Sequence, residues 1–500
     1  MKISNSGTFK PRPIWIVAGV LLVSLILRWM LIFRGGQYYI SDETRYEVSR
    51  NAAKFLLQGH FGEALKQFTF SPEHLGFKVI GVIPALMEHL VGTSLVFPAI
   101  FFGLFSVLNL YLIFLLSQRG HVTSNESLYA LLIASACLSL LYYARHLFPY
   151  DMAMSFGLLA SYVALARNQT AKTSFACGCL SFLCFITYNG YWSLAGFVML
   201  ANILIHSERI TEVLQKTIFT SAGFITPFAL LVIAMLQSGT NMISAYGLFA
   251  ASITQGSFEE GWSLPFEYFW HTEHIIILIL GALSITAVIS QYNYPRQDVK
   301  LWLGGILFIY LCLFIPSVIL NYFVVYGRLA RQIIPFLALL SAQGLVQIEN
   351  RVTSGHKVAT MILVVIFIQA AWNFVYTYRL SYPREFVAEA QARFPKFEFS
   401  SKRLAFGAPV ICQNNGYVME SAKYYVTPPA NIPQVEGQLL MSAPHPENFL
   451  PYQYDGDSPP VRQFFRIQKL RMNFYKVDEQ FMSATNPAWM AIKNCTIREK

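Results

Sequence analysis

The sequence predicts an α-helical membrane protein with about 11 spans, interfacial helices and a small C-terminal α/β domain outside the cytoplasm. Hydrophobic residues make up 55% of the 500 residues and charged residues only 13%, whereas soluble domains carry about 25% charge. The apolar residues form blocks of about 16 to 24 residues, close to the roughly 20 helical residues that cross a bilayer. This pattern excludes a soluble protein, a disordered chain and a transmembrane β-barrel, whose spans are alternating segments of about 10 residues.

The first apolar block runs from Ile14 to Phe33 and follows Lys2, Lys10 and Arg12. No cleavage site of small residues follows it, so we expect a retained first helix and not a signal peptide. Basic flanks stay in the cytoplasm. The segment after Phe33 is therefore expected outside.

Ten further apolar blocks complete the expected bundle. They are 94–117, 126–147, 151–167, 172–187, 190–206, 217–237, 275–291, 301–320, 332–347 and 357–377. The shorter block 76–92 contains Lys78 and Glu88. If it spans, five short basic loops fall outside. If it lies in the interface as an amphipathic helix, all five fall inside, as the positive-inside rule requires. We therefore expect a membrane bundle over 1–378, with external loops at 34–93 and 238–274.

The segment 379–500 differs in composition from the bundle. It holds 15 Lys and Arg, 11 Asp and Glu, many prolines and no block that could span. The run at 405–412 reads as a buried strand, which indicates a small α/β domain on the external side. Cys412 and Cys495 lie here and can pair only if the domain is exported.

Two acidic positions stand at the expected external rim of the bilayer. Asp42 and Glu43 follow the first span and fit either a catalytic pair or simple capping of the next helix. Asp151 lies between two spans with almost no loop, where a carboxylate is costly without a partner. Arg145, His146 or a metal ion can supply that partner, and Asp151 can also cap the following helix.

Further polar residues gather on the same expected face. Glu73 and His74 are candidate metal ligands, and Lys78 is a candidate phosphate partner, or all three are ordinary interfacial residues. The aromatic segment 262–274 contains His271 and His274, which add acid–base or metal capacity or belong to an interfacial anchor.

Arg328 and Arg331 stand at the external end of a span, against the positive-inside trend. Arginine is suited to phosphate, although a pair of snorkelling arginines gives the same pattern. Together, these groups predict a membrane-level pocket with carboxylates, cations and aromatic residues, which is the set that a lipid-linked phosphate substrate requires.

Three segments resemble the C-type glycosyltransferases (GT-C), which use polyprenyl-phosphate-linked sugars. They are DETRYEVSRNAAKFLLQGHF after the first span, RHLFPYDM between two later spans and YGRLARQIIPFLALLSA near the end of the bundle. The likeness covers about residues 14–377 and is greatest to the branch of the protein O-mannosyltransferases and the aminoarabinose transferase of lipid A modification.

The resemblance implies roles for individual residues. Asp42 would be the general base, Glu43 would support it or bind the sugar, and Asp151 would bind metal or substrate. Arg328 and Arg331 would hold the lipid phosphate.

One motif departs from the family pattern. Residues 73–76 read EHLG, so the usual phosphate-binding lysine is missing there, and Lys78 is the candidate substitute, with Arg145 as a further phosphate ligand. Glu73 and His74, completed by His271 or His274, would form the site of a divalent metal ion.

The expected function is an inverting glycosyltransferase of a bacterial inner membrane, with its active site in the periplasm. It would move a sugar from a polyprenyl-phosphate carrier to a hydroxyl of lipid A or lipopolysaccharide, another glycan or a protein. The sequence has no P-loop or Rossmann glycine pattern, so no nucleotide cofactor or nucleic acid is expected. An oligosaccharide ligase or polymerase, a transporter and a scaffold remain the alternatives.

Overall fold

The computed structural model describes most of the membrane bundle and five later strands. The described residues are 14–37, 43, 45–69, 73–119, 124–166, 169–205, 207–237, 264–290, 297–319 and 327–380, the strands given below, and residues 244, 247 and 392. Asp42 lies outside them.

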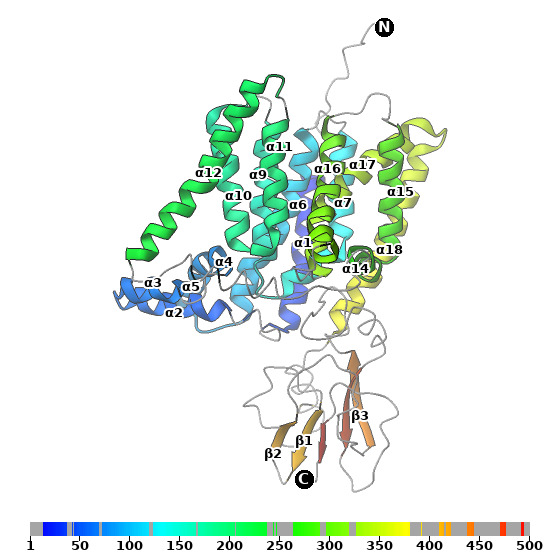
Figure 1. The fold of residues 1–500 in the computed structure, drawn as a ribbon. Helices are drawn as coiled ribbons and strands as arrows, with labels where there is room; N and C mark the ends of the chain where they lie inside the picture. Colours follow the sequence, from blue (N-terminus) through cyan, green and yellow to red (C-terminus); the bar gives the residue numbers. More distant parts are fainter. Residues whose placement is uncertain are drawn as a thin grey trace, which may run out of the picture.

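The bundle consists of long helices that run side by side (Figure 1). They are α1 (Ile14–Arg34), α6 (Val96–Arg119), α7 (Ser124–Ala136), α8 (Leu138–Leu141), α9 (Tyr150–Ala164), α10 (Ala171–Thr187), α11 (Trp192–Leu204), α12 (Ile210–Gln237), α15 (Ile275–Ser290), α16 (Gln297–Phe314), α17 (Ile334–Arg351) and α18 (Gly355–Arg379). Each of the eleven predicted apolar blocks therefore contains a helix. The block 126–147 contains two, α7 and α8. The predicted helical membrane fold is confirmed.

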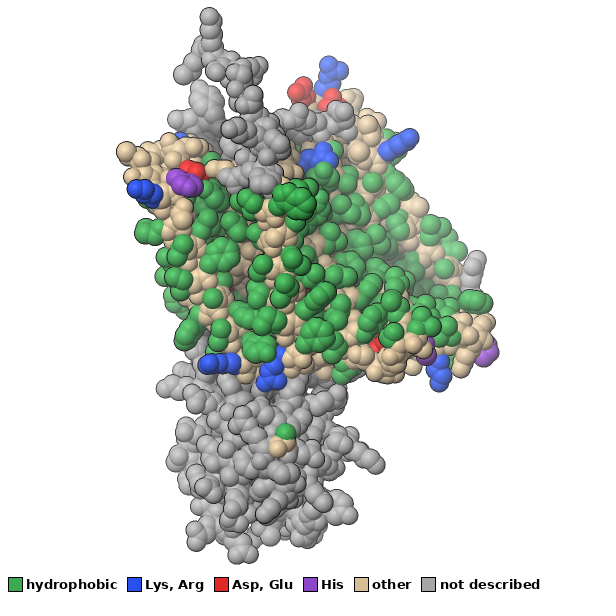
Figure 2. Space-filling model, turned by 180° about the vertical axis from the view of Figure 1, so that it is seen from behind, with side chains coloured by type: hydrophobic (Ala, Val, Ile, Leu, Met, Phe, Trp, Pro, Cys, Tyr) green, Lys and Arg blue, Asp and Glu red, His purple; other side chains and the backbone are tan. Residues whose placement is uncertain are grey.

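Six helices of the described part are long and apolar enough to cross a bilayer alone, and the bent pair α7–α8 makes a seventh. Figure 2 shows hydrophobic side chains over the middle of the visible face, with Lys and Arg side chains near its upper and lower rims. Lipid-facing residues such as Leu22, Leu230 and Ile368 are more than half exposed. Such an apolar belt between charged rims is what a bilayer requires.

Four short helices lie across one end of the bundle in Figure 1. They are α2 (Tyr46–Leu57), α3 (Phe61–Thr69), α4 (Leu75–Ile80) and α5 (Val82–Val91). With 6 and 10 residues, α4 and α5 are each too short to span, which agrees with an interfacial block at 76–92. Glu88 of α5 joins this layer together, because it accepts hydrogen bonds from Arg50 at 2.7 Å and from Tyr46 at 3.1 Å.

The block 126–147 is not one straight span. The chain bends by 77° between the helix that ends at Ala136 and the one that begins at Leu138. After the bend, α8 continues as the 3-10 helix η2 (Tyr142–Arg145). Further short elements connect the spans: η3 (Asn189–Tyr191), α14 (Leu264–Glu273), the π-helix η4 (Ile315–Ile319) and the 3-10 helix η5 (Gly327–Ile333).

The C-terminal strands form two small sheets. The strands are β1 (Val410–Asn414), β2 (Tyr417–Ser421), β3 (Gln438–Pro444), β4 (Arg471–Lys476) and β5 (Ile492–Asn494). β1 pairs antiparallel with β2 and parallel with β5, while β3 pairs antiparallel with β4. The predicted strand at 405–412 overlaps β1. The side chains of Cys412 and Cys495 lie outside the description, so their pairing stays a prediction, as does the boundary at 379.

Candidate active site

Three cations from three different elements meet at the bundle end that carries α2–α5. Arg45 directly precedes α2, Lys78 belongs to α4 and Arg328 to η5. All three act electrostatically on His74. The carboxylate of Glu73 lies 4.0 Å from Arg45 Nε and 3.6 Å from Lys78 Nζ. We call Arg45, Lys78 and Arg328 the cation cluster.

His74 lies beneath this cluster in an unusual backbone conformation. Its φ of 55° is left-handed, and its N–H donates to Asn189 Oδ1 at 3.1 Å. The ring is 5% exposed and lies 4.9 Å from the ring of Tyr188. Burial, with the three neighbouring cations as a further cause, holds the pKa of His74 well below its usual value. His74 is therefore a neutral imidazole at physiological pH.

Gly76 of the EHLG segment lies against the end of α10. A Cβ at this position would lie 2.5 Å from Thr187 Oγ1 and 3.0 Å from the Thr187 backbone. Only glycine therefore lets α4 approach the end of α10 this closely. Lys78, two residues further along α4, lies inside the cluster with its side chain fully buried.

A row of three tyrosines extends from the cluster into the bundle. The ring of Tyr188 lies 4.6 Å from that of Tyr150, which lies 5.0 Å from that of Tyr143. Arg328 stands 5.8 Å over Tyr150, and Arg331 stands 4.8 Å over Tyr143. The two arginines therefore occupy successive places along one aromatic row.

Arg331 and Asp151 form a buried ion pair at the inner end of this row. Arg331 is 0% exposed and Asp151 4% exposed. Asn109 donates to the backbone carbonyl of Asp151 at 2.9 Å, and Arg331 Nε donates to the Ser139 carbonyl at 2.8 Å. Among the described residues, the partner of Asp151 is therefore Arg331 and not Arg145 or His146. The charge of Arg331 is already neutralised by Asp151. Arg328 is therefore better placed than Arg331 to bind a phosphate.

Glu43 is fully buried and fixes the chain next to Asp42. Its Oε1 accepts the N–H of Leu147 at 2.8 Å, and its Oε2 lies 3.3 Å from Nδ1 of His146. A carboxylate held in this way supports its neighbour more readily than it binds a sugar. The geometry therefore favours a role of Glu43 in supporting Asp42 over a role in binding the sugar.

Arg145 has a structural place that differs from the predicted phosphate contact. Its guanidinium donates to the carbonyls of Gly35, Thr377 and Leu380, and its side chain is fully buried. These bonds connect the ends of α1 and α18. Since three carbonyls already take its donors, Arg145 does not belong to the cation cluster.

The structure does not bring the predicted metal ligands together. His274 is exposed and lines a shallow hollow with Ile368 and Trp372, and Figure 1 shows α4 and α14 well apart on either side of the bundle. The side chain of His271 lies outside the description. Within the described ranges, no three His, Cys, Asp or Glu residues gather as metal ligands. Moreover, the cations around Glu73 and His74 favour an anion, so these residues do not fit a divalent metal ion.

Two contributors escaped the sequence analysis. Arg45 follows Asp42 and Glu43 on the expected external side. Like Arg328, it is a basic residue that breaks the positive-inside trend, and this signal could have identified it. Glu273, the last residue of α14, is the second contributor. Its oxygens accept the N–H groups of Leu138 and Ser139, both at 2.8 Å. No sequence signal reveals that contact.

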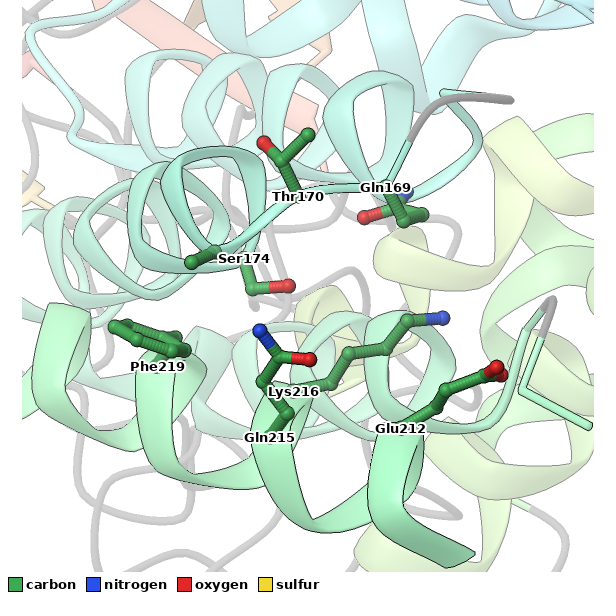
Figure 3. A pocket seen from close by; sticks show the side chains of 8 residues that line it. Gln169, Thr170, Ser174, Glu212, Gln215, Lys216 and Phe219 are labelled. Atoms are coloured by element: carbon green, nitrogen blue, oxygen red, sulfur yellow. The ribbon is translucent and has the colours of Figure 1, made fainter. Parts of the chain in front are cut away.

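A separate hollow of about 270 Å³ lies between the starts of α10 and α12. Figure 3 shows Ser174, Gln215, Lys216 and Glu212 around it. Lys216 donates to the carbonyl of Ile205 at 2.6 Å. The hollow stands at the bundle end opposite α2–α5 (Figure 1), so it is not part of the cation cluster.

No protein-family model and no curated protein matches the chain. Among solved structures, ArnT from Cupriavidus metallidurans bound to undecaprenyl phosphate is similar, with a TM-score of 0.51 and 11% identity over 76% of this chain and 72% of that chain. The oligosaccharyltransferase AglB from Archaeoglobus fulgidus, in complex with an inhibitory peptide and a dolichol-phosphate, gives a TM-score of 0.44, with 10% identity over 73% of this chain and 55% of that chain. The chain therefore has the fold of ArnT.

Proposed function

We propose that this integral membrane protein is a glycosyltransferase that moves a sugar from a polyprenyl-phosphate carrier to a hydroxyl acceptor. The observation that carries the proposal is the cation cluster at the membrane edge, on the same bundle end as the segment fixed by Glu43. A phosphate needs cations, a prenyl chain needs an apolar wall, and a sugar stacks on aromatic rings. The ArnT structure that shares this fold was solved with undecaprenyl phosphate.

The charge of the cluster suits the leaving group better than the donor. A sugar linked through phosphate to a lipid is a diester with one negative charge. When the sugar departs, the lipid monophosphate gains a second charge at neutral pH. Arg45, Lys78 and Arg328 all act on His74 beside Glu73, and burial of Lys78 and Arg328 limits screening by water. The cluster therefore stabilises the charge that develops in the transition state.

The transfer is a single displacement. The acceptor oxygen attacks the anomeric carbon, and its bond to carbon forms as the bond from carbon to the phosphate oxygen breaks. The electron pair of that bond stays with the phosphate, and the hydroxyl proton goes to Asp42 as general base. Glu43, bound to Leu147 and His146, anchors the chain next to this base. One displacement inverts the anomeric centre.

The short basic loops support an external site. The bundle end opposite α2–α5 holds the end of α6 at Arg119, the start of α12 after Arg209 and the end of α17 at Arg351. By the positive-inside rule that end is cytoplasmic. The cluster then faces the periplasm in a bacterial inner membrane, where lipid A, another glycan or a protein can be the acceptor.

The test compares Arg328→Gln with Arg351→Gln. Both changes remove one arginine from an end of the same span, but Arg351 lies at the far end and donates only to the carbonyl of Ser290 among its described contacts. We expect purified Arg328→Gln to lose about 10²-fold in kcat/KM for sugar transfer from a polyprenyl-phosphate donor. Arg351→Gln should stay close to the unmodified protein. Equal activities in the two variants would remove Arg328 from the site.

A further inference from the structure

The segment after the bend, residues 138–147, contacts several parts of the proposed active site. The carbonyl of Ser139 accepts Arg331 Nε at 2.8 Å. The N–H of Leu147 donates to Glu43 at 2.8 Å, and His146 contacts the same carboxylate. One short stretch of chain therefore fixes both the support of the general base and the arginine of the buried ion pair.

The N-terminal side of this segment depends on one side chain from a distant part of the sequence. The first N–H groups after a bend have no partner within their own helix. Glu273, the last residue of α14, accepts the N–H groups of Leu138 and Ser139, one on each carboxylate oxygen. Glu273 is fully buried, so the contact excludes water.

Ser139 connects the two systems. Its N–H donates to Glu273 while its carbonyl accepts from Arg331, and Arg331 pairs with Asp151. Glu273 also interacts electrostatically with Arg331. A displacement of Glu273 would therefore shift the peptide on which Arg331 rests, and with it the position of Leu147 against Glu43.

We propose that Glu273 is a positioning residue for sugar transfer, because it holds segment 138–147 in the place that aligns Glu43 and Arg331. The inference rests on the proposed function. It assigns Glu273 no contact with donor or acceptor. Its influence passes through the backbone of Leu138 and Ser139.

Glu349 offers a matched control. Whereas Glu273 binds the start of α8, the carboxylate of Glu349 binds the start of α7, where it accepts from Asn125 Nδ2 at 3.1 Å and from Tyr129 Oη at 3.0 Å. Glu273→Gln and Glu349→Gln therefore each remove one hydrogen-bonded carboxylate that contacts the bent helix pair α7–α8. Only the first touches the segment after the bend.

The experiment measures kcat and KM for a polyprenyl-phosphate sugar donor, together with the melting temperature in detergent. We expect Glu273→Gln to lower kcat by about 10- to 100-fold with less than a threefold change in KM, while Glu349→Gln keeps kcat within about twofold. Glu273→Asp, which retains the charge, should recover part of the lost kcat. A purely structural role would lower the melting temperature and the fraction of active protein. It would not lower the kcat of the folded protein while KM stays nearly constant.

Three outcomes overturn the inference: equal kcat in the two Gln variants, a loss confined to KM, or failure of both Glu273→Gln and Glu273→Asp to fold. Failure of the unmodified protein to transfer sugar from any polyprenyl-phosphate donor would instead remove the proposed function itself. The two failures are therefore distinguishable.

Discussion

Replacing Asp151 by Asn tests whether the buried ion pair is structural. The change keeps the shape of the side chain but leaves the fully buried Arg331 without its counter-charge. Removing one partner of a buried pair costs about 3–5 kcal/mol, a large part of a typical folding free energy of about 5–15 kcal/mol. Replacing both partners by neutral residues of similar size, as in Asp151→Asn with Arg331→Met, removes the unpaired charge and should recover most of that loss.

The assay is reversible unfolding of the purified protein in detergent, followed by fluorescence, for both single variants and the double variant. Glu63→Gln is the control, since Glu63 pairs with Lys66 at 2.7 Å with both side chains about half exposed. Such a pair contributes only about 0.2–1 kcal/mol. If Asp151→Asn were as stable as the unmodified protein, Arg331 would not depend on Asp151. The carboxylate would then be available for substrate or metal, as the sequence motifs implied.

Two further predictions concern the cation cluster. Burial lowers the pKa of Lys78 to about 8, so its charge is present below that pH and lost above it. We expect kcat/KM to fall on the alkaline side with an apparent pKa near this value. Lys78→Arg should remove this limb, and an unchanged limb in that variant would exclude Lys78 as its source. Gly76→Ala should raise KM for the donor because the new Cβ meets Thr187. The control Gly62→Ala, which has open space around its Cβ, should leave KM unchanged. Equal KM values in the two variants would contradict the packing argument.

The sequence predicted the membrane fold well because span length and apolarity are local properties. It also placed Asp151 correctly as a buried carboxylate that needs a partner. It could not choose that partner, because Arg331 is 180 positions away, whereas Arg145 and His146 are nearer in the chain. Only packing of α9 against η5 decides between them.

The bend at Cys137 shows a second limit. The block 126–147 contains no proline or glycine to mark a break, so it read as one continuous span. Directly after the bend, Glu273 accepts the N–H groups of Leu138 and Ser139. That bond joins residues 135 positions apart, and no local pattern encodes it.

The predicted metal site lies in surroundings that do not favour a metal cation. Glu73 and His74 are ordinary metal ligands by residue type. In the folded chain, Arg45, Lys78 and Arg328 surround them, which makes the place attractive to an anion. Residue type alone could not show this, because the three cations come from distant segments.

The central claim is tested most directly by sugar transfer in lipid vesicles that contain the purified protein, a polyprenyl-phosphate sugar and a hydroxyl acceptor. We predict release of polyprenyl phosphate with formation of a glycoside of inverted anomeric configuration. Asp42→Asn should lower the rate by about 10²- to 10⁴-fold. Retained anomeric configuration, or undiminished turnover in Asp42→Asn, would contradict the account.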